Sequence, residues 1–141
     1  MPLNNIGSVH GSRGNYTEAL EYHQRSLKIS EGIGDKNGSA RALMGISIVH
    51  QSQGSYDLAI EFANQADGIA KQIGSTETFW YARTTAGQAY RSLNRYDLAR
   101  KAFADAIDTI EELRDQVAGG EQQRQQFFEE KLSPYHAMVD L

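Results

Sequence analysis

The chain has 141 residues, which is enough for one domain or for one segment of a longer repeat array. Lysine and arginine total 14 against 18 aspartate and glutamate, and a formal net charge of −4 argues against nucleic acid as a partner. The absence of cysteine excludes disulfides, thiolate nucleophiles and cysteine-ligated zinc. No apolar run approaches the roughly 18 residues that cross a membrane. We therefore expect a cytoplasmic protein that binds neither nucleic acid nor membrane.

The sequence repeats itself at a spacing of 40 residues. A third copy is weaker but keeps the same register, since the run from Tyr56 to Ala59 returns from Tyr96 to Ala99. Three repeats are therefore predicted. The residues that recur 40 positions later, from the first copy to the second, are Leu3, Ile6, Val9, His10, Ser12, Gly14, Tyr16, Ala19, Glu21, Ile29, Ile33 and Gly34.

Each repeat is predicted to contain two amphipathic helices, because its apolar residues fall at helical spacing on both sides of a turn. The first helix is expected to end in a left-handed residue, which is Gly14, Gly54 or, in the third repeat, Asn94. Asn15 and Ser55 then stand where side chains cap the second helix.

The second helix of each repeat is predicted to run for about 17 residues, to Ile33, Ile73 or Leu113. Glycine follows the first two of these ends. Residues 35–38 and 75–76 are predicted to form the loops that lead to the next repeat.

Small residues are expected where two helices of a repeat cross closely, because an interaxial distance of about 8–10 Å leaves little space for side chains. A helical pair of this kind cannot bury its apolar stripe alone, so successive pairs must stack. The residues that recur at these crossings are Gly7, Ser47 and Gly87 in the first helix and Ala19, Ala59 and Ala99 in the second.

The pattern resembles the tetratricopeptide repeat family, whose signature joins a small residue in the first helix, a Gly-x-Tyr turn and an alanine in the second helix. The first repeat carries these features at Gly7, at Gly14-Asn15-Tyr16 and at Ala19. The 40-residue length is similar to that of repeats in kinesin light chains and many bacterial proteins. The resemblance implies an all-α fold, a right-handed α-solenoid of helix-turn-helix repeats, and a non-enzymatic role in protein–protein interaction.

We expect three repeats in residues 1–118, at about 1–38, 39–76 and 77–118, and a C-terminal helical extension in residues 119–141. The register fails in this extension, which reads as the truncated start of further repeats. Its apolar residues lack a following helix and are predicted to support a homodimer, with self-assembly as an alternative function. These residues are Phe127, Phe128, Leu132, Tyr135, Met138 and Leu141.

The segment from Ile110 to Tyr135 also resembles the repeat region that precedes caspase-like CHAT domains in bacterial proteins. This resemblance implies an alternative function, in which the repeats are a regulatory or scaffold segment of a larger peptidase. The protease itself cannot lie in this chain, because the chain has no cysteine.

Catalytic, metal and cofactor sites are not expected. His10 and His50 occupy the same place in two repeats, where the third has Tyr90, and His23 corresponds to Ala63 and Phe103, so these are packing positions. Neither His10 nor His50 has a second ligand at metal-binding spacing, and no glycine-rich loop follows a strand.

A partner-binding groove is expected on the concave side, which the first helices of the three repeats would line. Such a groove, mixed and faintly basic, suits an extended peptide or a partner helix. Tyr81 and Met44 would make apolar contacts, and Arg41 and Arg91 would bind acceptors or carboxylates. The predicted groove residues are Asn4, Ser8, Arg41, Met44, Ile48, Tyr81, Thr84, Gln88 and Arg91.

Overall fold

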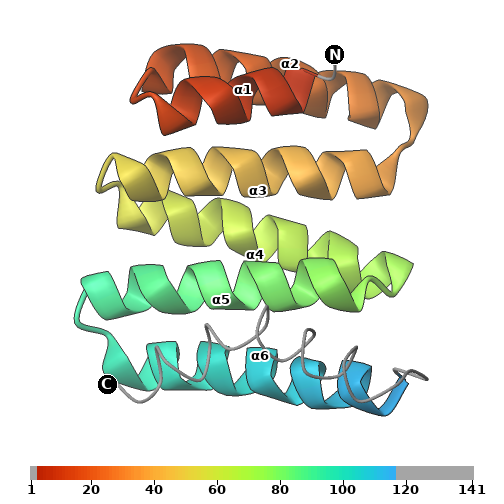
Figure 1. The fold of residues 1–141 in the computed structure, drawn as a ribbon, viewed down its shortest axis with the longest axis vertical. Helices are drawn as coiled ribbons and strands as arrows, with labels where there is room; N and C mark the ends of the chain where they lie inside the picture. The colour runs from red at the N-terminus through yellow and green to blue at the C-terminus, as the bar shows by residue number, and fades with distance from the viewer. Residues whose placement is uncertain (1–2, 117–141) are drawn as a thin grey trace, which may run out of the picture.

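The computed structural model describes residues 3–116, and within this range every regular element is an α-helix (Figure 1). The helices come in pairs that correspond to the three repeats, and short turns join them. They are α1 (Leu3–Ser12), α2 (Tyr16–Ile33), α3 (Lys36–Ser52), α4 (Tyr56–Ile73), α5 (Thr76–Ser92) and α6 (Tyr96–Gln116).

Each helix packs mainly against its neighbours in sequence, and α3 also contacts both α1 and α5. Helices α1, α3 and α5 run side by side along one side of the molecule (Figure 1). The fold is therefore an all-α helical repeat solenoid, as the sequence predicts. The apolar core lies between the layers and includes Leu43, Met44, Ala63, Ala66, Ala82 and Ala86.

The turns inside the repeats have the predicted left-handed residues, at Gly14 (φ 78°), Gly54 (φ 80°) and Asn94 (φ 60°). Asparagine tolerates this conformation better than other residues with a side chain, so it replaces glycine in the third turn. Gly34 and Gly74 end α2 and α4 in the same conformation.

The predicted side-chain caps at Asn15 and Ser55 are wrong, because neither side chain caps its helix. The main-chain N–H of Asn15 donates to the carbonyl of His10 at 2.8 Å, and Ser55 donates to His50 in the same way. This bond belongs to the C-terminal motif of the preceding helix. Backbone hydrogen bonds therefore close these turns.

The connections between repeats are shorter than predicted. Residues 36–38 are not a loop, because α3 begins at Lys36. Oδ1 of Asp35 accepts a hydrogen bond from the main-chain N–H of Gly38 at 2.9 Å, which makes Asp35 the N-cap of α3. Ser75 caps α5 by accepting from the N–H of Thr78 at 3.3 Å.

Residue sizes in facing helices compensate for one another. A Cβ atom added at Gly7 of α1 would lie 2.9 Å from Nε2 of His23 in α2. One added at Gly87 of α5 would lie 2.6 Å from Cε1 of Phe103 in α6. Gly7 and Gly87 therefore lie where the facing helix comes close, but each glycine makes room for a buried ring rather than for the predicted alanine.

Candidate functional site: a cavity along the first helices

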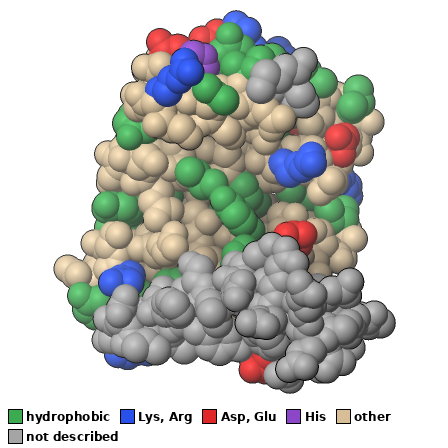
Figure 2. Space-filling model, in the orientation of Figure 1, with side chains coloured by type: hydrophobic (Ala, Val, Ile, Leu, Met, Phe, Trp, Pro, Cys, Tyr) green, Lys and Arg blue, Asp and Glu red, His purple; other side chains and the backbone are tan. Residues whose placement is uncertain are grey.

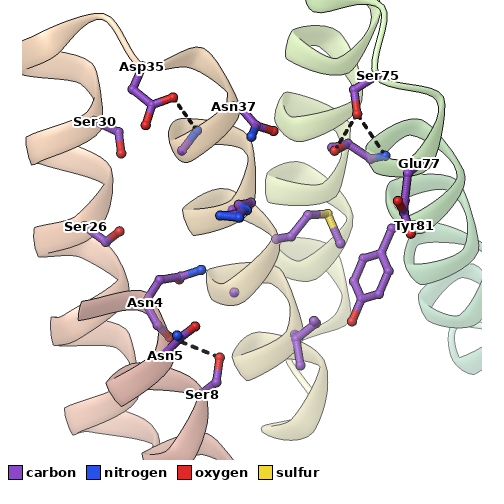
Figure 3. Close-up of a pocket in the computed structure, with 16 residues that line it drawn as sticks. Asn4, Asn5, Ser8, Ser26, Ser30, Asp35, Asn37, Ser75, Glu77 and Tyr81 are labelled. Atoms are coloured by element: carbon purple, nitrogen blue, oxygen red, sulfur yellow. Dashed lines mark hydrogen bonds between the residues drawn. The ribbon is translucent and has the colours of Figure 1, made fainter. Parts of the chain in front are cut away.

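A cavity of about 940 Å³ lies where α1, α3 and α5 come together with the C-terminal half of α2 (Figure 3). Its wall combines hydroxyl and amide side chains with a few apolar and charged ones. The lining residues are Asn4, Asn5, Ser8, Ser26, Ser30, Asp35, Asn37, Gly38, Arg41, Met44, Gly45, Ile48, Ser75, Glu77, Thr78 and Tyr81.

The structure brings six of the nine predicted groove residues to this cavity, namely Asn4, Ser8, Arg41, Met44, Ile48 and Tyr81. Ile48 and Tyr81 are 38% and 43% exposed. The ring of Tyr81 extends from α5 toward the cavity (Figure 3). Met44 lines the same cavity but is only 5% exposed, so most of its side chain belongs to the core.

The other three predicted residues lie on α5 outside the cavity lining. Thr84 is buried, and its Oγ1 atom has no hydrogen-bond partner among the described residues. Oε1 of Gln88 accepts a hydrogen bond from Nε2 of Gln51 at 3.4 Å. Arg91 is half-buried in the last turn of α5.

The predicted faintly basic character is wrong for this cavity. Its charged lining residues are Arg41, Asp35 and Glu77, so carboxylates outnumber cations. Asp35 is already engaged as the cap of α3. Arg41 is exposed and forms no ion pair with any residue of the described range 3–116.

Ser26 and Ser30 of α2 and Asn37 at the start of α3 also line the cavity, and sequence reasoning missed them. The prediction considered only the first helices of the repeats. The one available signal was the spacing of Ser26 and Ser30, which lie four residues apart and therefore share one face of α2.

Asn4 is tied to a histidine beneath the cavity. Nδ1 of His23 forms a hydrogen bond with Oδ1 of Asn4, and the imidazole is 1% exposed. Gly7 on one side and Gly45 on the other face this ring, and a Cβ atom at Gly45 would overlap it. Burial lowers the pKa of His23 below its ordinary value of 6.5, because the charged form would lose its hydration.

Hydrophobic side chains gather in a hollow in the middle of this face, and mostly uncharged polar surface surrounds them (Figure 2). Charged side chains lie mainly toward the edges of the described surface in this view. This distribution matches the lining of the cavity, in which the apolar residues come from α3 and α5.

Neither a metal-binding cluster nor a membrane-spanning helix lies in the described residues. In residues 3–116, no three histidine, cysteine or acidic side chains come close enough together to hold a metal ion. In that same range, no helix has the length and apolar character needed to cross a membrane. The predicted C-terminal extension, its self-association residues and the register failure lie outside the described residues.

The chain matches the tetratricopeptide repeat family over residues 1–72 and again over residues 81–112. A crystal structure of a TPR-like protein from Chlorobium tepidum superimposes with a TM-score of 0.69 at 17% sequence identity. The alignment covers 98% of this chain and 90% of that one, which supports the same fold. No curated protein is similar enough in sequence to count as a relative.

Proposed function

Because the chain belongs to the tetratricopeptide repeat family, we propose that its cavity binds an extended peptide segment of a protein partner. Repeats of this family generally mediate protein–protein interaction, and the family and its fold are typically non-enzymatic. The observation that carries the proposal is one cavity of about 940 Å³ that the first helices of all three repeats share.

The chemistry of the lining fits a peptide main chain. Asparagine and serine side chains both donate and accept hydrogen bonds, so they can pair with the N–H and C=O groups of an extended segment. Asn4, Asn5 and Asn37 lie around the cavity in the view of Figure 3. Helix partners have no free main-chain groups along their length, so this lining favours an extended segment over a helix.

The apolar and charged residues would supply the side-chain contacts. Ile48 and Tyr81 offer exposed apolar surface for one hydrophobic side chain of the peptide. Arg41 has no ion-pair partner among the described residues and would pair with an acidic side chain or with a main-chain carbonyl of the peptide. Aromatic and arginine residues dominate the binding energy of protein interfaces, so Tyr81 and Arg41 are the expected anchors.

Peptides selected from a random library on the full 141-residue chain would test the proposal. We expect Tyr81→Ala and Arg41→Ala each to weaken the best selected peptide by about tenfold or more. Tyr96→Ala and Arg13→Ala are matched controls, because both residues are exposed and neither lines the cavity. Equal losses in the control variants would contradict the proposal.

A further inference from the structure

The contact between His23 and Asn4 has a consequence for the cavity, since only Asn4 of the two residues lines it. The amide oxygen of Asn4 can only accept a hydrogen bond, so Nδ1 of His23 must carry the hydrogen. Because burial disfavours the charged ring, the imidazole is neutral and carries this hydrogen on Nδ1. One lone pair of the Asn4 oxygen is then engaged on the side of α2, and the NH2 group of Asn4 remains available to an acceptor.

The ring of His23 has little freedom to change this arrangement. It is 1% exposed, and Gly7 of α1 and Gly45 of α3 approach it from two sides. A side chain larger than hydrogen at either position would overlap the ring. The imidazole is therefore held between two helices that both contribute to the cavity wall, and it fixes the orientation of the Asn4 amide.

We propose that His23 is a positioning residue for the peptide site, which presents the NH2 group of Asn4 to a main-chain carbonyl of the bound segment. This inference rests on the proposed peptide-binding function. It assigns a direction to one hydrogen bond of the site, because the bond to His23 leaves the NH2 group of Asn4 to donate to an acceptor of the peptide. The neighbouring side chains of Asn5 and Ser8 are exposed and have no comparable restraint from a buried ring.

The tautomer of His23 can be measured on the free chain, before any ligand is known. Nitrogen-15 chemical shifts of the imidazole distinguish the form protonated on Nδ1 from the form protonated on Nε2. We expect the Nδ1 form and, on replacement by His23→Phe, a shift of the side-chain NH2 signals of Asn4. An imidazole protonated on Nε2 at neutral pH would overturn the proposal.

Binding of the best peptide from the random library gives the second measurement. His23→Phe removes the donor and keeps a ring of the kind that Phe103 places over Gly87 in the third repeat. We expect this variant to keep its fold and to bind that peptide about tenfold more weakly. Asn4→Ala should cause a similar loss, and the double variant should lose no more than Asn4→Ala alone.

His50→Phe is the matched control, because this histidine stacks on Phe62 and does not line the cavity. Its binding should stay within about twofold of the unmodified chain. If Arg41→Ala weakens binding and His23→Phe does not, the positioning role is wrong and the peptide-binding function stands. If neither Arg41→Ala nor His23→Phe affects binding, the peptide-binding function is wrong, and so is the positioning role that rests on it.

Discussion

The two junctions between successive repeats share one backbone arrangement and differ in their buried side chains. At the first junction, between α2 and α3, Leu27 packs against a cluster that contains Met44. The corresponding residues at the second junction, 40 positions later, are Asp67 and Thr84. Both are more than nine-tenths buried, and Oδ1 of Asp67 and Oγ1 of Thr84 have no hydrogen-bond partner in the described range.

A second pair of positions differs in the sizes of its side chains. The first junction places the ring of His23 against Gly45, where no side chain other than hydrogen fits. The corresponding residues of the second junction are Ala63 and Thr85, both buried. The first junction therefore combines a large ring with a glycine, whereas the second combines an alanine with a threonine.

The comparison shows that the repeat determines where the helices lie, whereas different sets of buried side chains can fill the junctions between them. The first junction combines an apolar contact with a tightly held polar ring that reaches the cavity through Asn4. The second junction buries polar atoms without partners, which costs about 1–3 kcal/mol for each group. We therefore expect substitutions at the first junction to destabilise the fold, and apolar substitutions at the second junction to stabilise it.

Gly45→Ala should give the largest effect. The added methyl group would overlap the His23 ring, and overpacking of a core costs about 1–3 kcal/mol. Gly68→Ala is the matched control, because it lies inside α4 with nothing within 4 Å and should stabilise the chain by about 1 kcal/mol. Urea denaturation measures both.

The cause of the Gly45→Ala effect can be tested by removing the imidazole ring of His23. In the double variant with His23→Ala, the added methyl group has space, as at Ala63 and Thr85. The two destabilisations should then sum to clearly more than that of the double variant. Additive effects would show that the glycine is required for some reason other than the imidazole.

Replacing the polar pair of the second junction should have a smaller effect of the opposite sign. Asp67→Leu with Thr84→Met introduces the residues of the first junction and removes two unpaired polar atoms. We expect a gain of about 1–2 kcal/mol in the free energy of unfolding. The substitution also removes the contact of Lys71 with Asp67, 3.6 Å long, in which the lysine is mostly exposed and the carboxylate mostly buried. A lower urea midpoint would contradict the interpretation.

Much of the fold follows from local rules that the sequence displays. The 40-residue echo predicts three helical pairs, and the left-handed turns at Gly14, Gly54 and Asn94 follow from residue type alone. The capping error at Asn15 does not follow from the closing of the preceding helix, because Asp35 and Ser75 close the helix before them in the same way and still cap the next one. Nδ2 of Asn15 instead lies 3.4 Å from Nδ1 of His10, a contact that propensity rules do not describe.

The cavity was less predictable than the fold. Helical spacing identified the face that Ile48 and Tyr81 share, but the packing of successive pairs decides how deeply each residue lies. Met44 and Thr84 are therefore buried although their spacing resembles that of exposed residues. The approach of Ser26 from α2 depends on the same packing, and no local pattern encodes it.

The smallest expected effect is a pH dependence that belongs to the first junction. Burial lowers the pKa of His23, so the folded chain binds its proton less readily than the unfolded chain does. The unfolded chain gains this proton as the pH falls below 6.5, and stability declines from there until the lower pKa of the folded state is passed.

Asn4, Gly7 and Gly45 face the ring of His23, and none of them titrates. Urea unfolding from about pH 8 to about pH 5 measures the decline in stability as a falling midpoint. His23→Phe should flatten the curve over this range. A midpoint that rises as the pH falls through 6.5 would show that the buried imidazole is stabilised in its charged form, and the contact with Asn4 would then need another proton arrangement.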